Sequence, residues 1–164
     1  MKQVKTALSW LFVSVLIIGL DQGVKYWVLH RVTDQSVIPV FPFLNIIFRL
    51  NAGAAFGFLD NQSGWQIYLL SGISAIVSVV LIIWLGRLKR SAWCTAFPVS
   101  LVLGGALGNL MDRVHYGYVI DFIDFHVKNW HFATLNIADS AVCVGAVWLI
   151  VNLICESICG RNSN

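Results

Sequence analysis

Residues 65–86, WQIYLLSGISAIVSVVLIIWLG, form a run of 22 residues without a charged side chain. As an α-helix this run extends about 33 Å, which is enough to cross the hydrocarbon core of a bilayer. A soluble domain carries roughly a quarter charged residues, whereas only 12% of this 164-residue chain is charged and 58% is hydrophobic. The chain is therefore expected to be an integral membrane protein.

Three further apolar segments accompany this run. We predict membrane-spanning helices over about 7–29, 65–86, 93–111 and 136–159. Each is long enough to cross a bilayer. The predicted fold class is an all-α membrane protein with four transmembrane helices, forming a single integral membrane domain over residues 1–164.

Basic residues indicate how the chain is oriented. The short loop after the second predicted helix carries Arg87, Lys89 and Arg90, and short loops rich in Lys and Arg mark the cytoplasmic side. An even number of spans puts both termini on the side of that loop, so both are expected to be cytoplasmic. Seven of the eight acidic residues fall toward the opposite side. The polar groups that carry function are therefore expected to face outward.

Two long connections lie on this outer side. Residues 30–64 are rich in Val, Ile and Phe and are interrupted by Pro39, Pro42, Gly53 and Gly57. This composition favours short strands, so we predict a small extracytoplasmic β-sheet. Residues 112–135 mix aromatic residues with Asp and His, and we predict an interfacial loop.

Polar residues gather near the outer ends of the first and third predicted helices. Asp21 and Lys25 are four residues apart and pair on one helix face, which lowers the cost of placing either charge in lipid. A packing ion pair is the favoured interpretation. In GGALGNLMDR (104–113), Asn109, Asp112 and Arg113 come close together at the helix end. A guanidinium here suits binding of a carboxylate, a phosphate or a backbone carbonyl.

Carboxylates provide the most specific chemistry. VIDFIDF (119–125) holds Asp121 and Asp124 among large apolar residues, and spacing alone does not choose between them. Asp139 lies in the first turn of the fourth predicted helix, one turn after Asn136, and an ionisable group within a span predicts a functional site. Two carboxylates that meet in a dry site share a proton, so the pair can activate water and polarise a carbonyl, as in aspartic proteases.

Other classes of protein remain open at this point. A small transporter or channel would use Asp21, Lys25, Arg113 and Asp139 as an ion path, but such residues usually lie near the bilayer midplane and here they crowd at one end. A lipid-binding membrane scaffold or a Mg²⁺-dependent enzyme acting on lipid phosphates would use the same outer groups. We expect no metal and no cofactor because the acids are spread singly among apolar residues. The net charge of +3 does not suggest a nucleic-acid partner.

Five segments together resemble one known family. They are DQGVK (21–25), NAGAAFG (51–57), GGALGNLMDR (104–113), VIDF (119–122) and NIADS (136–140). In this order, and at these places relative to four spans, they resemble the lipoprotein signal peptidases, the type II signal peptidases of bacteria. The likeness covers essentially the whole chain. One departure is Leu135, where the family often has Phe.

The resemblance implies an aspartic endopeptidase of the bacterial inner membrane that cuts prolipoproteins just before a diacylglyceryl-modified Cys. By motif, Asp121 and Asp139 are the implied catalytic pair, and Asp121 is preferred over Asp124. The implied residues that hold substrate, orient the pair or support the site are Asn51, Asn109, Arg113, Asn136, Asp21, Lys25 and Asp112. The resemblance also implies contact with membrane lipid and inhibition by the cyclic peptide globomycin at the same site.

Overall fold

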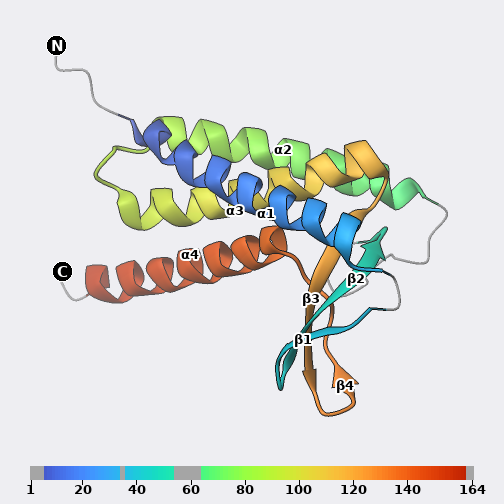
Figure 1. The fold of residues 1–164 in the computed structure, drawn as a ribbon. Helices are drawn as coiled ribbons and strands as arrows, with labels where there is room; N and C mark the ends of the chain where they lie inside the picture. The colour runs from blue at the N-terminus through green and yellow to red at the C-terminus, as the bar shows by residue number, and fades with distance from the viewer. Residues whose placement is uncertain (1–5, 34–35, 54–63, 162–164) are drawn as a thin grey trace.

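The structure is a computed structural model that describes residues 6–33, 36–53 and 64–161, with side chains described as far as residue 158. The helices lie side by side, and a small β-sheet projects from one end of the bundle (Figure 1). Residues 54–57, which complete the NAGAAFG segment, lie outside the described residues.

Four long helices correspond to the four predicted spans. They are α1 (Leu11–Arg31), extended at its start by the short 3-10 helix η1 (Ala7–Trp10), α2 (Trp65–Arg87), α3 (Trp93–Tyr116) and α4 (Ile137–Arg161). Each is long and apolar enough to cross a membrane. The prediction of four transmembrane helices is therefore confirmed within the described residues.

The third helix is longer than predicted. It was expected to end near Met111 but continues to Tyr116, and Gly117 then takes the left-handed conformation (φ 78°) that commonly ends helices. Asp112 and Arg113 therefore lie within α3 and are held on its surface by the helical backbone. They do not belong to the outer connection.

Helix α3 lies at the centre of the bundle and packs against α1, α2 and α4. Small residues make this packing close. A Cβ atom at Gly104 would lie 3.0 Å from the backbone of Ser14 in α1, and one at Gly105 would lie 2.3 Å from the carbonyl oxygen of Ala138 in α4. Larger side chains would separate the helices, so these glycines set the distance at which polar groups on α1, α3 and α4 meet.

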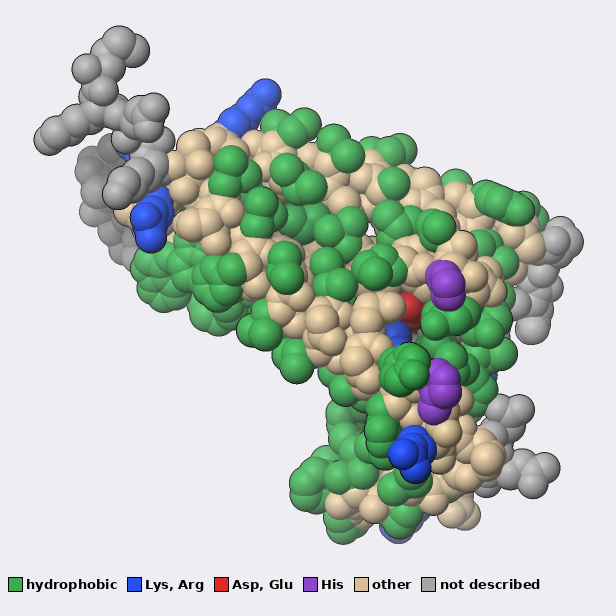
Figure 2. Space-filling model, turned by 45° about the horizontal axis from the view of Figure 1, so that its top comes forward, with side chains coloured by type: hydrophobic (Ala, Val, Ile, Leu, Met, Phe, Trp, Pro, Cys, Tyr) green, Lys and Arg blue, Asp and Glu red, His purple; other side chains and the backbone are tan. Residues whose placement is uncertain are grey.

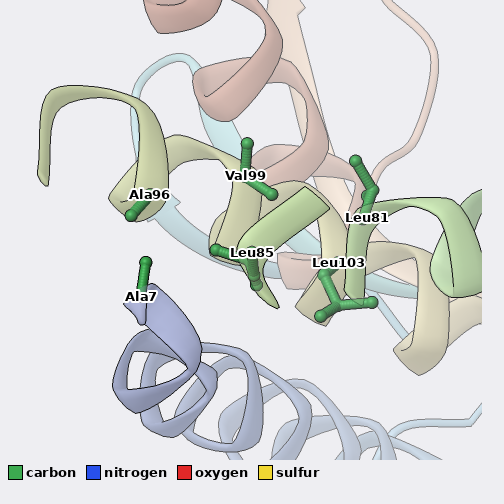
Figure 3. Packing of buried hydrophobic residues seen from close by; sticks show 6 residues of the cluster. All are labelled: Ala7, Leu81, Leu85, Ala96, Val99 and Leu103. Atoms are coloured by element: carbon green, nitrogen blue, oxygen red, sulfur yellow. The ribbon is translucent and has the colours of Figure 1, made fainter. Parts of the chain in front are cut away.

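The end of the bundle opposite the sheet is held by apolar packing. Figure 3 shows six buried side chains from η1, α2 and α3 that form one cluster: Ala7, Leu81, Leu85, Ala96, Val99 and Leu103. The backbone N–H of Ala7 donates to the carbonyl of Leu88, 3.0 Å away. The start of the described chain therefore lies against the α2–α3 loop.

The sheet has four antiparallel strands in the order β1-β2-β3-β4: β1 (Ile38–Phe41), β2 (Leu44–Asn51), β3 (Val119–Val127) and β4 (Trp130–His131). The small sheet predicted for the first outer connection is confirmed. The loop predicted over 112–135 is wrong for β3 and β4. The sequence VIDFIDFHV is rich in β-branched and aromatic residues, and β2 offers it a hydrogen-bonding edge, so it is extended.

Apolar packing joins the sheet to the bundle. Ile120 and Phe122 of β3 are buried in one cluster with Val28 and Val32, at the end of α1. Because side chains alternate along a strand, this packing turns Asp121, which lies between them, to the opposite face of the sheet.

Candidate active site

Asp121 is held between two side-chain amides. Its Oδ1 accepts a hydrogen bond from Nδ2 of Asn136 at 2.8 Å, and its Oδ2 accepts one from Nδ2 of Asn51 at 2.9 Å. Asn51 is itself fixed, since its Oδ1 accepts the backbone N–H of Gly53. Asp121 is only 1% exposed. Neutral amides orient both of its oxygens without neutralising its charge.

Asp139 belongs to the first turn of α4. Its Oδ1 accepts a hydrogen bond from Nδ2 of Asn109 at 2.7 Å. Its backbone N–H donates to Oδ1 of Asn136 at 2.7 Å, so Asn136 acts as the N-cap of α4. The sequence NIADS therefore forms a capped helix start that presents a carboxylate beside the sheet.

Asn136 connects the two aspartates. Its amide nitrogen donates to Asp121 and also lies 3.2 Å from Oδ1 of Asn109, which in turn donates to Asp139. A chain of two amides therefore links one carboxylate to the other. Asp121 and Asp139, which are 18 positions apart in the sequence, are thereby brought into one network.

A buried ion triad lies behind the pair. Nζ of Lys25 is 2.7 Å from Oδ2 of Asp21 and 2.7 Å from Oδ2 of Asp112, and all three side chains are almost completely buried. The predicted pairing of Asp21 with Lys25 is therefore confirmed. Lys25 also donates to Oδ1 of Asn109 at 3.1 Å. The triad thus fixes the amide that orients Asp139.

The carboxylates of the triad also bind backbone groups next to both aspartates. Oδ1 of Asp21 accepts the N–H of Ala138, which precedes Asp139 in the chain, at 2.9 Å. Oδ2 of Asp112 accepts the N–H of Ile120, which precedes Asp121, at 3.2 Å. The triad therefore links α1 and α3, through hydrogen bonds, to the backbone immediately before each aspartate.

Gln22 is a member of this network that the sequence reading missed. Its Nε2 donates to Oδ1 of Asp112 at 2.7 Å and to the carbonyl of Gly108 at 3.2 Å. The sequence feature that could have identified Gln22 is its position in the DQGVK segment, directly after Asp21. Helical spacing did not distinguish it because its partner is 90 residues away.

Arg113 joins the site to the loop after β2. Its Nη2 donates to the carbonyl of Gly53 at 3.0 Å, and its Nη1 lies 3.4 Å from the carbonyl of Asn109. A cavity of about 810 Å³ opens beside Arg113, between the start of α2 and the end of α3, and Trp65, Tyr68 and Ser71 also line it. Arg113 thus lies between the polar network and an open space.

The hydrogen bonds and ion pairs join all nine predicted site residues into one network, which we call the inner cluster: Asp21, Lys25, Asn51, Asn109, Asp112, Arg113, Asp121, Asn136 and Asp139. Asp124 is outside it. Asp124 belongs to a second group farther along β3, the outer cluster of Asn45, Asp124, His126 and His131.

The surroundings of Asp121 change its acidity. The pKa of Asp121 is raised from 3.8 to about 7: burial is the largest cause, the nearby charge of Asp139 also raises it, and the hydrogen bonds from Asn51 and Asn136 oppose the rise. Two carboxyl groups within electrostatic range in a dry site do not ionise together without cost. A pair of this kind can share one proton, which is the arrangement that acid–base chemistry requires.

Comparisons with known proteins identify the family of the chain. The family model described as Signal peptidase (SPase) II matches residues 13–155 of the chain. The chain is a member of the signal peptidase II family. It is a multi-pass bacterial membrane protein, and the comparisons do not favour a transporter or a lipid-binding scaffold.

Similar members of the signal peptidase II family are known by sequence and by structure. The chain is 50% identical over 153 residues to the lipoprotein signal peptidase of Coxiella burnetii (strain RSA 331 / Henzerling II), covering 93% of this chain and 94% of that one. It is 43% identical over 146 residues to the lipoprotein signal peptidase of Shigella boydii serotype 4 (strain Sb227), covering 89% of each chain.

A solved bacterial membrane enzyme, determined by the in meso method at 2.3 Å resolution, superimposes with a TM-score of 0.81 at 30% identity, covering 91% of this chain and 89% of that chain. The fold of this signal peptidase II family member, with its four helices and projecting sheet, is therefore the fold of a known membrane enzyme.

Proposed function

We propose that this chain is an aspartic endopeptidase that removes the signal peptide from diacylglyceryl-modified prolipoproteins by cutting just before the lipid-modified Cys. The observation that carries the proposal is the meeting of Asp121 and Asp139, joined through the amides of Asn136 and Asn109. Lipoprotein signal peptidases in Coxiella and Shigella, to which the chain is similar, support the choice of substrate.

In the proposed reaction the pair works as acid and base. The ionised carboxylate removes a proton from a water molecule, which attacks the carbonyl carbon of the scissile peptide bond. The protonated carboxyl donates its proton to the carbonyl oxygen, which gives a tetrahedral intermediate. As the C–N bond breaks, a proton passes from the pair to the leaving nitrogen. We propose that the pair shares one proton near neutral pH, because burial and the charge of Asp139 raise the pKa of Asp121 to about 7.

The remaining residues of the inner cluster are proposed to hold geometry and substrate. Asn51, Asn109 and Asn136 fix the carboxylate oxygens, and Lys25 with Asp21 and Asp112 fixes the backbone on both sides. Arg113, beside the cavity between α2 and α3, is proposed to orient the substrate chain.

The proposed placement in the cell is the inner membrane, with both termini in the cytoplasm. The basic α2–α3 loop and the described ends of the chain lie at the end of the bundle opposite the sheet (Figure 1), which supports this orientation. The active site would then lie at the outer surface, at the depth where a lipid anchor holds its attached peptide. Globomycin is proposed to bind at the same site.

The test is cleavage of a diacylglyceryl-modified precursor by the purified full chain in detergent. We expect Asp121→Asn and Asp139→Asn each to abolish measurable processing, and globomycin to inhibit the wild type. Asp124→Asn is the matched control because it removes a buried carboxylate from the same strand but outside the inner cluster. Substantial turnover by either mutant of the pair, with the folded state intact by circular dichroism, would reject the aspartic mechanism.

A further inference from the structure

Two histidines of the outer cluster lie opposite each other on neighbouring strands. His126 of β3 and His131 of β4 are cross-strand partners, and their rings are stacked with centroids 5.3 Å apart. Only Lys128 and Asn129 separate the two strands, and so short a turn fixes which residues lie opposite each other. Cross-strand partners have their side chains on the same face of a sheet. The backbone therefore holds the two imidazoles side by side.

Each of these imidazoles has its Nδ1 engaged in a hydrogen bond. Nδ1 of His126 lies 3.2 Å from the carbonyl oxygen of Lys128, and because a carbonyl only accepts, this nitrogen carries a proton. Nδ1 of His131 lies 3.0 Å from both carboxylate oxygens of Asp124 and donates to them. Among the side chains that the structure describes, neither Nε2 has a hydrogen-bond partner. In the neutral ring each Nε2 therefore has a free lone pair.

Histidines that bind metal ions in proteins usually show this arrangement. The nitrogen that does not bind the ion donates to a carboxylate or to a backbone carbonyl, which fixes the ring and makes the other nitrogen a better ligand. His131 has the carboxylate partner and His126 has the backbone carbonyl. Asp124 is itself 3% exposed and accepts a hydrogen bond from the amide of Asn45 at 3.1 Å. The support for His131 is therefore fixed in place.

The histidine pair is accessible to an ion from solution. The side chain of His131 is 55% exposed and that of His126 is half-buried, and the β3–β4 turn lies near the tip of the projecting sheet (Figure 1). Two nitrogen ligands of a tetrahedral Zn²⁺ ion lie about 3.4 Å apart, because each Zn–N bond is about 2.1 Å long. Rings with centroids 5.3 Å apart allow their Nε2 atoms to reach this separation.

The ligands determine which kind of ion fits. Among the described residues no three His, Cys, Asp or Glu side chains are arranged to hold one metal ion, so the protein supplies two ligands here and water completes the coordination. Imidazole suits Zn²⁺, Cu²⁺ and Ni²⁺, whereas Mg²⁺ and Ca²⁺ prefer oxygen ligands. The pair therefore fits an exchangeable transition-metal ion. The expectation of no metal from the sequence rested on the spread of the acids, whereas this site is built from histidines.

We propose that His126 and His131 form a binding site for a divalent transition-metal ion such as Zn²⁺, with Asp124 orienting His131. The bound ion joins β3 to β4 beside their turn, and because it binds the folded hairpin it stabilises the end of the sheet. This proposal does not depend on the proposed protease activity, since the outer cluster shares no residue with the inner cluster.

The test is binding of Zn²⁺ to the purified full chain in detergent, measured by isothermal titration calorimetry. Purification uses an affinity tag without histidine, and the four cysteines are replaced by Ser so that thiolates do not bind the ion. We expect one Zn²⁺ per chain and no competition from excess Mg²⁺. His126→Ala and His131→Ala are each expected to bind at least about tenfold more weakly, because loss even of a residue that only supports a metal ligand has an effect of this size.

His30→Ala is the matched control. Nδ1 of His30 lies 2.8 Å from the carbonyl oxygen of Tyr26, as Nδ1 of His126 lies near a carbonyl, but the ring of His30 packs against Tyr26 and, among the described residues, against no second histidine. Figure 2 shows histidine side chains that likewise stand apart from one another near the end of the bundle where the sheet begins. His30→Ala is expected to keep the affinity within about twofold of the parent protein.

Three results would overturn the proposal: no binding of Zn²⁺ by the parent protein, unchanged affinity in either variant of the pair, or an equal loss in His30→Ala. A second measurement needs no variant of the pair. Cu²⁺ bound to the parent protein is expected to show hyperfine splitting from two imidazole nitrogens in its electron paramagnetic resonance spectrum. Splitting from a single nitrogen would mean that the two histidines do not share an ion, and the proposal would be rejected.

Discussion

Strand β3 carries two buried aspartates three residues apart, and their surroundings differ in kind. Asp121 receives hydrogen bonds from two neutral amides and faces the charge of Asp139. Asp124 receives one amide hydrogen bond, from Asn45, and its second partner is the imidazole of His131, which becomes a cation when protonated. Burial is common to both residues, so burial alone does not distinguish them.

The two clusters differ also in how exposed the nitrogen groups beside their carboxylates are. In the inner cluster Lys25 is 2% exposed and is shared by Asp21 and Asp112. In the outer cluster the His131 side chain is 55% exposed. Solvent screens the outer pair and hardly reaches the inner one. The inner cluster is therefore expected to control both activity and stability, and the outer cluster to contribute to the local stability of the sheet.

The largest difference between the two aspartates is expected in cleavage of a lipid-modified precursor. Asp121→Asn removes a group that donates or accepts a proton in each proposed step, and loss of acid–base catalysis costs up to about 10⁴-fold in rate. Asp124→Asn is expected to keep the rate within about tenfold of wild type. Similar losses in both variants, with folding intact, would remove the distinction between the clusters.

Removal of the buried cation is expected to have the largest effect on stability. Lys25→Met leaves Asp21 and Asp112 buried without their shared partner, and breaking a buried ion pair costs about 3–5 kcal/mol. Thermal unfolding of the purified chain in detergent measures this change. Lys89→Met, at an exposed lysine in the α2–α3 loop, is the control, and it is expected to change stability by less than about 0.5 kcal/mol. Equal effects would contradict a special role for Lys25.

The stability of the chain is expected to depend on pH through Asp121. Its pKa is raised in the folded chain from 3.8 to about 7, so the folded state binds a proton more tightly than the unfolded state does. The stability that this proton contributes is fully present below about pH 4 and is lost as the pH rises to about 7. Asp121→Asn cannot ionise, so it is expected to be more stable than wild type above pH 7.

The measurement is the unfolding midpoint of wild type and of Asp121→Asn at each pH from 4 to 8. If the difference between the two midpoints does not grow in favour of Asp121→Asn as the pH rises, the prediction is contradicted. Processing by the wild type is also expected to decline above about pH 7, where the pair loses its shared proton.

The smallest effect is expected at His131. His131→Ala removes a partner of Asp124 that is largely exposed, and such ion pairs contribute about 1 kcal/mol or less. Precursor processing is expected to remain within about twofold of wild type because His131 does not contact the inner cluster. A loss of processing comparable to that of Asp121→Asn would show that the two clusters are coupled through β3.

Most of the fold could be predicted from the sequence because hydropathy is a local property. The charge-free run at 65–86 and three further apolar segments predicted four spans, and the Val, Ile and Phe residues of 30–64 predicted short strands. The interpretation of 112–135 as a loop was wrong because β3 is stabilised by pairing with β2, about 75 positions earlier. Pairing over that distance leaves little trace in local composition.

The sequence by itself determined that this chain is a membrane protein with its acids gathered at one end, and its motifs indicated which acids to examine. Only the tertiary structure decided that Asp121 and Asp124 belong to different clusters, that Gln22 joins Asp112, and that one amide, Asn136, connects the two aspartates. The physical reason is that apolar burial depends on the type of each residue. A hydrogen bond depends on two groups meeting within about 3 Å, and here those groups come from α1, β2, β3, α3 and α4.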